Sequence, residues 1–478
     1  MEPNYPKSLT SNEIPNISPN RPSNCVPRVN FNRAKEICSP FWPDLETCRR
    51  IMILMHHEMN RCLDVPDHPA NDFKMLNTYV TQLPQGNETG QYLALDLGGT
   101  NYRVLLITFD VDSSEPTIEY DTERIPPELM TGKGDELFQF IAKSVKKFLT
   151  ERELLDVHFD MGFTFSFPVK QTSINRGTLI RWTKGFSADD VVGKDVVEIL
   201  NRAMSALNLN VTCRIITNDT VGALASCKLT YPDTVAGVIV GTGTNAAFAS
   251  ELPAGPSFND LPPSATYVVI NTEWGAFGDH GLLDEFKTEF DRIIDEESKN
   301  PGKQTYEKMI SGMYLGEITR HILRRLVNER ILLQGNMPEK WNDMDSIPTS
   351  LLSDIARDPD YLFYNTERII REHFNVTEYT DEDLQIIHHV GVAVANRAAL
   401  YAGTGVACLV NRIKRREVTV GVDGSLFKLH PNFPANMLNV IRRLANPLFH
   451  CKLQMSEDGS GKGAGALVAS LMRHTRSC

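Results

Sequence analysis

The sequence has 478 residues, of which 41% are apolar and 23% are charged. This apolar fraction is large enough to form a sizeable core, so a chain that is disordered throughout is excluded. Its 49 Lys and Arg and 60 Asp and Glu give a net charge of −11. A general nucleic-acid or anionic-membrane binder needs a basic face, so neither class is expected, although a local basic cleft is compatible with this charge.

At roughly 150 residues per domain the length suggests about three domains, and two large lobes fit as well. Residues 1–27 contain six Pro and five Asn, which predicts a disordered leader. No apolar run approaches the roughly 18 to 20 residues that span a bilayer, so no membrane insertion is expected. The nine cysteines are scattered and form no C-x-x-C, which is typical of free thiols in a reducing cytoplasm.

The first half of the chain alternates helical and strand patterns. Residues 44–64 predict an amphipathic helix that begins after Asp44. Strands at 91–96 and 102–109 flank a Gly-rich turn, which indicates a β-hairpin. The further elements expected here are helices at 135–155 and 188–208 and strands at 159–165 and 213–217.

The pattern then recurs, with strands at 234–240 and 246–250 around a second turn of Gly and Thr. Long helical stretches follow, and a final helix is expected after the Gly-rich residues 458–463. Two strand-rich starts, each followed by helices, predict two α/β lobes of related plan. The later elements expected are helices at 281–297, 304–332, 366–374, 381–416 and 434–445 and a strand at 418–422.

Two turns have the composition of phosphate-binding loops. In residues 96–101 (DLGGTN), glycines bring backbone N–H groups close to an anion, and Asp96 can hold Mg²⁺ through waters. Residues 241–245 (GTGTN) offer a second such turn. Either turn alone is also compatible with an ordinary hairpin. A dinucleotide fingerprint is rejected at the second turn because no helix follows the glycines, and residues 458–463 lack the spacing of a P-loop.

Three further motifs carry polar side chains that suit a polyol. Thr183 and Lys184 follow a strand, although such a pair is usually on the surface. Asp219 lies between a strand and a helix, where it could equally be a helix cap. Glu273 lies among apolar residues and glycines, a setting that suits a buried acceptor for hydroxyl groups. Together with the two turns, these motifs indicate phosphoryl transfer to a sugar.

At these motifs the chain resembles the eukaryotic hexokinases and glucokinases of the actin-like ATPase superfamily. The sugar-binding signature is matched at 162–168 (GFTFSFP) and 182–186 (WTKGF), and the resemblance runs from about residue 30 to about 475. It implies an α/β, two-lobed actin-like ATPase (ribonuclease H-like) fold with a cleft between two domains. The implied small domain is 83–218 plus 456–478, and the large domain is 28–82 plus 219–455.

The resemblance also implies a function and site residues. The activity is ATP-dependent phosphorylation of glucose and other hexoses at the 6-hydroxyl, the first step of glycolysis, with Mg²⁺ as cofactor. Asp219 is implied as the general base, assisted by Lys184, and no metal-ligating side-chain set is expected. The implied sugar contacts are Ser166, Thr183, Lys184, Asn218, Asp219, Asn245, Glu273 and Glu307. The implied nucleotide contacts are Asp96, Gly98, Gly99, Thr100, Asn101, Arg103, Thr242, Gly243, Gly312, Gly424 and Ser425.

Two departures from the family pattern and two rival functions stay open at this point. Met313 follows a position where some relatives carry Lys, and the C-terminal Gly-rich stretch has one extra residue. A catalytically silent glucose sensor of the same fold is one alternative, and an actin-like ATPase or chaperone is the other. The sequence predicts neither the preferred hexose nor the oligomeric state.

Overall fold

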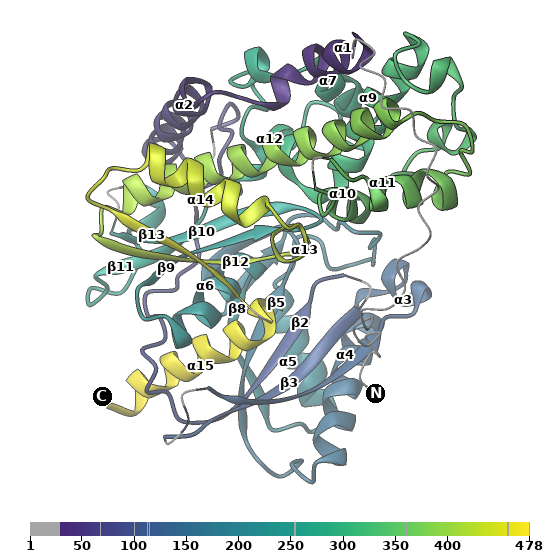
Figure 1. Ribbon diagram of the computed structural model, residues 1–478. Helices are drawn as coiled ribbons and strands as arrows, with labels where there is room; N and C mark the ends of the chain where they lie inside the picture. The colour runs from purple at the N-terminus through teal and green to yellow at the C-terminus, as the bar shows by residue number, and fades with distance from the viewer. Residues whose placement is uncertain are drawn as a thin grey trace.

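The computed structural model describes residues 29–477, apart from residues 67, 100, 112, 114, 253, 254, 360 and 457. The predicted leader at 1–27 lies outside this part. The described chain forms two large β-sheets, one above the other in Figure 1, with α6 and α15 between them, and a small two-stranded sheet. Most of the helices cover the upper, six-stranded sheet, and α4 and α5 cover the lower, five-stranded one (Figure 1).

The five-stranded sheet has the order β4-β3-β2-β5-β8. Its first three strands form an antiparallel meander, and β5 and β8 then add parallel to β2. The hairpin predicted around residues 96–101 is therefore present. The strands are β2 (Gly90–Leu97), β3 (Asn101–Phe109), β4 (Thr117–Arg124), β5 (Phe159–Phe165) and β8 (Val211–Thr217), with a separate hairpin of β6 (Val169–Ser173) and β7 (Arg176–Leu179).

The six-stranded sheet has the order β1-β11-β10-β9-β12-β13. Strands β9, β10 and β11 repeat the antiparallel meander, and β12 and β13 add parallel to β9. The two sheets thus share one plan, which confirms the predicted pair of related α/β lobes. The strands are β1 (Leu76–Asn77), β9 (Thr234–Val240), β10 (Thr244–Glu251), β11 (Tyr267–Asn271), β12 (Glu417–Asp423) and β13 (His450–Met455).

The helices fill the connections between strands. The predicted cap of the second helix is observed, because the Asp44 carboxylate accepts a hydrogen bond from the Thr47 amide at 2.8 Å. The helices are α1 (Val29–Cys38), α2 (Leu45–Asp64), α3 (Pro127–Thr131), α4 (Gly134–Glu151), α5 (Val196–Ala206), α6 (Asp219–Thr230), α7 (Glu289–Glu297), α8 (Thr305–Ile310), α9 (Gly312–Asn328), α10 (Thr349–Ile355), α11 (Tyr364–Arg368), α12 (Asp381–Ile413), α13 (Ser425–Leu429), α14 (Phe433–Leu444) and α15 (Gly459–Ser477).

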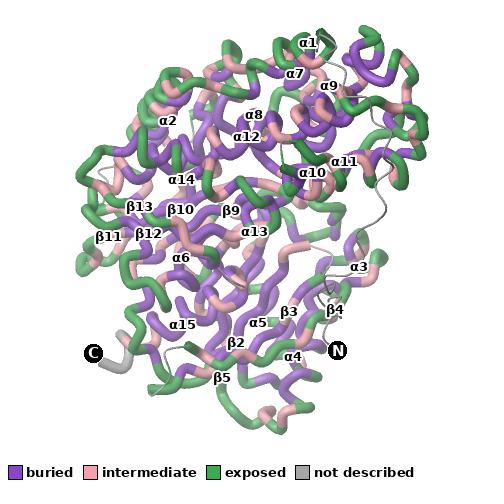
Figure 2. Tube along the Cα trace, in the orientation of Figure 1, coloured by how far each residue is buried: buried purple, intermediate pink, exposed green. Residues whose placement is uncertain are grey.

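Alternate residues of β2 face two different cores. Leu93 and Leu95 pack into a core with α4 and α5. Tyr92 and Ala94 face a larger core that continues through α6 and α15 to the six-stranded sheet. Figure 2 shows this buried backbone running through both sheets and α12. The five-stranded sheet lies within residues 83–218, but the boundaries of the two domains stay a prediction.

Several predicted helices have different bounds in the structure, and the helix expected at 281–297 begins only at Glu289. The helix expected at 188–208 begins only at Val196, because Gly193 has φ +81° and Asp195 caps the helix from outside. The helix expected at 304–332 is interrupted at Ser311, which is extended and separates α8 from α9. This break brings the amide of Gly312 to the Gly241 carbonyl oxygen at 2.7 Å.

The glycines after Asp458 are part of α15 and do not form a separate loop before it. A Cβ on Gly463 would lie 2.0 Å from the carbonyl oxygen of Gly222 in α6, so only glycine allows this approach. A Cβ on Gly162 in β5 would likewise lie 2.5 Å from the Ala464 carbonyl oxygen. Helix α15 is therefore held between β5 and α6 by backbone-to-backbone contacts.

Helix α12 is long and apolar enough to cross a bilayer by length and composition alone, but 89% of its most apolar stretch is buried inside the protein. It is the central core helix beneath α2 and α14 (Figure 1). The sequence reading found no such stretch. Seven cysteines lie in the described part of the chain, and all seven are free and buried.

Candidate active site

Three polar side chains form a closed hydrogen-bond network at the ends of β10 and β11. Asn245 Nδ2 donates to Asn271 Oδ1 at 2.9 Å and to Glu273 Oε1 at 2.8 Å. Asn271 Nδ2 donates to the same Glu273 oxygen at 2.7 Å. The backbone of Glu273 is left-handed, with φ +51°. One oxygen of the Glu273 carboxylate is thus fixed by two amides. Of the three residues in the network, Asn245 and Glu273 were predicted from the sequence and Asn271 was not.

Glu307, in the first turn of α8, is held against the second glycine turn. Its Oε2 accepts a hydrogen bond from the Thr244 amide at 2.9 Å. A Cβ on Gly243 would lie 2.7 Å from that oxygen, so a larger residue here would displace the Glu307 carboxylate. Burial raises the pKa of Glu307, the Thr244 amide lowers it, and the neighbouring charges of Glu273 and Asp219 raise it further.

Asp219 is the first residue of α6 and lies close to the other site carboxylates. The helix is capped by Asn218, whose Oδ1 accepts from the Val221 amide at 3.1 Å. The side chain of Asp219 is therefore free of the capping role that the sequence left open, apart from its contact with the Thr220 amide at 2.8 Å. Burial raises the pKa of Asp219 to about 6, and the Lys184 charge partly offsets that rise.

Lys184 connects the first glycine turn to Asp219. It has a left-handed backbone, with φ +56°, and its Nζ donates to the Gly98 carbonyl oxygen at 2.7 Å. Its ammonium lies 5.6 Å from the centre of the Phe167 ring. Among the described groups, this cation is the one whose charge lowers the pKa values of both Asp219 and Glu307. The predicted pairing of residues 219 and 184 is thus consistent with the structure.

Ser166 and Thr183 are placed by backbone hydrogen bonds on either side of this lysine. The Ser166 amide donates to the Leu97 carbonyl oxygen at 3.1 Å, which joins the end of β5 to the end of β2. The Thr183 carbonyl oxygen accepts from the Phe186 amide at 3.1 Å. The rings of Trp182 and Phe186 stack at 5.4 Å and hold this turn. Both hydroxyl residues are partly exposed.

The first glycine turn begins at a buried ion pair. Asp96 Oδ2 accepts from Arg103 at 2.7 Å and from Ser460 Oγ at 2.6 Å. Arg103 also pairs with Asp458, just before α15. The Arg103 charge predicted for phosphate is therefore already shared between two carboxylates. Asp96 contributes to the raised pKa of Asp219 as well, so its carboxylate is close to that group.

Three separate segments meet at the second glycine turn. The Gly241 carbonyl oxygen accepts from the Gly312 amide, and the Thr242 carbonyl oxygen accepts from the Met313 amide at 3.1 Å. A Cβ on Gly241 would lie 3.3 Å from the Gly424 Cα, and Gly424 itself has φ +122°. The turn, the start of α9 and the start of α13 thus form one continuous backbone surface at the edge of the site.

The remaining predicted nucleotide contacts lie on these same turns. Gly98 and Gly99 are partly exposed between β2 and β3, and Asn101 is exposed at the start of β3. Thr242 and Ser425 are exposed. Thr100 lies outside the described residues. The described nucleotide contacts of the predicted set therefore lie on or beside the two turns and at the starts of α9 and α13.

Sequence reasoning missed three residues that hold this arrangement. Asn271 completes the amide network, and Ser460 joins the C-terminal helix to Asp96. Thr244 binds Glu307 through its amide and accepts from the indole nitrogen of Trp274 at 3.0 Å. Thr244 lies within the second turn and Asn271 lies two residues before Glu273, but the other partners of these two residues are 26 to 63 positions away in the chain, so no local signal assigns their roles.

The sheet plan and this site together define an α/β enzyme of the two-lobed actin-like ATPase fold. Comparison with known proteins specifies it further. Hexokinase family models match residues 33–229 and 235–470. The hexokinase of Schistosoma mansoni is 45% identical over 443 residues, which are 93% of this chain and 98% of that protein. The chain therefore belongs to the hexokinase family and is a hexokinase enzyme, and membership implies ATP as the phosphate donor.

Solved structures agree with this assignment. The structure of Schistosoma mansoni hexokinase complexed with glucose superposes with a TM-score of 0.84, covering 92% of this chain and 99% of that one. A second hexokinase structure, 29% identical, gives a TM-score of 0.81. Human hexokinase-2 is 41% identical over 440 residues, but this chain spans only 46% of its length.

Proposed function

We propose that this hexokinase transfers the γ-phosphoryl group of ATP to the 6-hydroxyl of glucose and related hexoses. The observation that carries the proposal is the convergence of Asp219, Lys184, Glu273 and Glu307, three carboxylates and one ammonium, beside two glycine turns. A glucose complex of a relative that is 45% identical supports the choice of sugar. We also propose a cytoplasmic location, in keeping with the free thiols, and no nucleic-acid partner, in keeping with the net charge.

Asp219 acts as the general base in this proposal. A sugar hydroxyl is a weak nucleophile at neutral pH, and a positioned base that accepts its proton contributes typically 10² to 10⁴-fold. A carboxyl group whose pKa is about 6 is ionised at neutral pH yet is more basic than an ordinary aspartate. Lys184 lies close enough to stabilise the ionised form and to offset negative charge on the transferred group.

The amide–carboxylate network binds the other sugar hydroxyls. Glu273 Oε1 is occupied by two amides, so its second oxygen is the acceptor available to a hydroxyl. Asn218, Ser166 and Thr183 supply further polar groups for the sugar. A buried acceptor without a hydrogen-bond partner costs binding free energy. Such a site therefore discriminates strongly between a sugar that carries the hydroxyl and an analogue that lacks it. Closure of the two lobes on the sugar would exclude water, the competing acceptor.

The glycine turns hold the nucleotide. Their backbone N–H groups can approach phosphate oxygens closely, and Gly312, Gly424 and Ser425 border the adenosine side. Among described residues no group of three or more His, Cys, Asp or Glu is arranged to hold a metal ion. A single carboxylate, Asp96, fits a Mg²⁺ ion that arrives bound to the phosphates and keeps most of its other ligands from phosphate and water. When bound, Mg²⁺ neutralises charge on the phosphate oxygens.

A coupled assay of glucose 6-phosphate formation tests the proposal and its rivals. We expect ATP-dependent product with glucose, and initial rates with mannose and fructose then define the preference. Glucose binding without product would instead indicate a silent sensor. ATP hydrolysis at the same rate with and without sugar would indicate an actin-like ATPase.

The raised pKa of Asp219 predicts how the activity depends on pH. Because the base must be ionised, kcat/KM for glucose should fall about tenfold per unit as the pH drops below about 6. It should be nearly constant from there to neutral pH. Initial rates over this range, with far-UV circular dichroism to show that the protein stays folded, check the prediction. A profile that stays flat well below pH 6 would contradict the assignment.

Replacing Asn271 with Ala removes one of the two amides that donate to Glu273 Oε1 and leaves only the direct bond from Asn245. We expect the glucose KM to rise about tenfold, since one buried hydrogen bond to a charged group is worth about 1.5 kcal/mol or more. The value of kcat should change less, because Asn271 does not touch the general base. Steady-state kinetics of this variant and of Asn328→Ala, an exposed asparagine at the end of α9, check this. An equal loss of kcat at unchanged KM would contradict it.

A further inference from the structure

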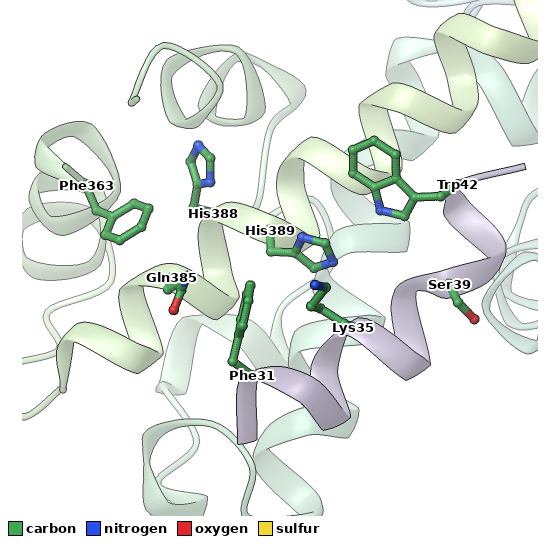
Figure 3. Close-up of a pocket in the computed structure, with 8 residues that line it drawn as sticks. All are labelled: Phe31, Lys35, Ser39, Trp42, Phe363, Gln385, His388 and His389. Carbon is green, nitrogen blue, oxygen red and sulfur yellow. The ribbon is translucent and has the colours of Figure 1, made fainter. Parts of the chain in front are cut away.

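A cavity of about 710 Å³ lies between the N-terminal helix and α12, and no residue of the active site lines it (Figure 3). Its volume is within the range of roughly 300 to 1,000 Å³ that is usual for small-molecule sites. The short 3₁₀ helix η1 (Ser39–Phe41) and the segment before α11 complete its walls. The residues that line it are Phe31, Lys35, Ser39, Trp42, Phe363, Gln385, His388 and His389.

Aromatic rings form most of the walls of this cavity. Phe31 meets the His389 ring edge-on at 5.5 Å, and Trp42 stacks on the other side of His389 at 6.0 Å. Phe363 packs against His388 at 5.3 Å. Trp42 is nevertheless 46% exposed, an unusual amount for an indole that has ring neighbours. The walls therefore offer flat apolar surface that the described residues leave uncovered.

Lys35 supplies the cation and His389 an imidazole on the polar side of the cavity, which Ser39 and Gln385 also line. The Lys35 ammonium lies 5.5 Å from the centre of the Phe31 ring, and Figure 3 shows its end beneath the His389 ring. His389 Nε2 is buried and has no hydrogen-bond partner among described residues. Burial and the Lys35 charge lower the pKa of His389 to about 4, so the ring is neutral at neutral pH and can donate one N–H.

Among the residues that the structure describes, no carboxylate lines the cavity. The nearby Glu382 is already engaged, because its Oε1 accepts the Phe31 amide at 3.0 Å and so ties α1 to α12. In a chain with a net charge of −11, this cavity therefore has a locally positive polar side. A ligand without negative charge would leave the Lys35 ammonium without an ion-pair partner. A purely polar ligand would leave the aromatic walls exposed to water.

We propose that this cavity is a second binding site, for a small molecule with a flat aromatic body and one carboxylate. The aromatic body lies among Phe31, Trp42 and Phe363. The carboxylate pairs with the Lys35 ammonium and accepts a hydrogen bond from His389 Nε2. The site is separate from the active site, so the ligand binds whether or not glucose is bound.

Isothermal titration of the full chain, saturated with glucose, tests the site with two matched probes. We expect 2-naphthoate to bind at one site and its neutral amide, 2-naphthamide, to bind at least tenfold more weakly. In the Lys35→Met variant, which keeps the apolar stem, 2-naphthoate should bind no better than the amide. The control Lys143→Met changes an exposed lysine on α4 and should leave binding unchanged. Equal binding of the two probes, or an unaffected Lys35→Met variant, would overturn the proposal.

A second measurement places the probe. Trp42→Leu should abolish 2-naphthoate binding while the glucose-phosphorylation rate stays within twofold, which also shows that the variant is folded. If Trp42→Leu does not fold, Phe363→Leu is used in its place. This variant removes the opposite ring and should weaken 2-naphthoate binding at least fivefold. Retained binding in the folded variant would overturn the proposal.

Discussion

Replacement of Asp219 by Asn is expected to lower kcat by about 10² to 10⁴-fold while glucose binding stays within a few-fold. The amide is nearly isosteric and its Oδ1 can still accept the Thr220 amide, so α6 should be unaffected. Only the ability to take up a proton is lost. The coupled assay gives kcat, and tryptophan fluorescence during glucose titration gives the binding constant.

The matched control is Asp135→Asn, which also alters an acid in the first turn of a helix. Asp135 is exposed on α4 and pairs with exposed Arg202 at 3.3 Å, so turnover should be unchanged. If Asp219→Asn retained near-normal turnover, the general base would have to be another group. If it lost glucose binding as well, Asp219 would be chiefly a sugar ligand.

The sequence predicted the hairpins and the order of the motifs because both depend on local signals. Alternating apolar residues around glycines specify β2–β3 and β9–β10 without reference to the rest of the chain. The break at Ser311 was missed because residues 304–332 keep a helical pattern. What interrupts that pattern is the contact between the Gly312 amide and the Gly241 carbonyl oxygen, 71 residues apart in the sequence numbering.

The site could be predicted as a set of residues but not as an electrostatic unit. Burial raises the pKa of Asp219, the Lys184 charge partly offsets that rise, and the charges of Glu273 and Asp96 add to it, although these groups come from separate segments. The sequence predicted that Arg103 would be a positive charge free to bind phosphate, whereas the structure pairs it with both Asp96 and Asp458. The glycines at the start of α15 were predicted to form a loop. They are helical instead, and Gly463 packs directly against the backbone of Gly222, which is far away in the chain.

Replacement of Arg397 by Met is expected to destabilise the protein by about 3 to 5 kcal/mol, because it leaves a buried carboxylate unpaired. Arg397 is fully buried on α12 and binds both oxygens of Asp291 on α7, at 2.6 and 2.7 Å. Burial alone would raise the pKa of Asp291, but the Arg397 charge holds it below its usual range. The guanidinium also lies 4.3 Å from the centre of the Phe41 ring.

Urea unfolding followed by circular dichroism measures this loss, and two further variants identify its cause. Arg49→Met breaks an exposed pair with Glu46 and should cost no more than about 1 kcal/mol. Adding Asp291→Asn to Arg397→Met removes the unpaired charge, so the double variant should be more stable than the single one. If Arg397→Met unfolded at the same urea concentration as Arg49→Met, the buried pair would not be what holds α7 against α12.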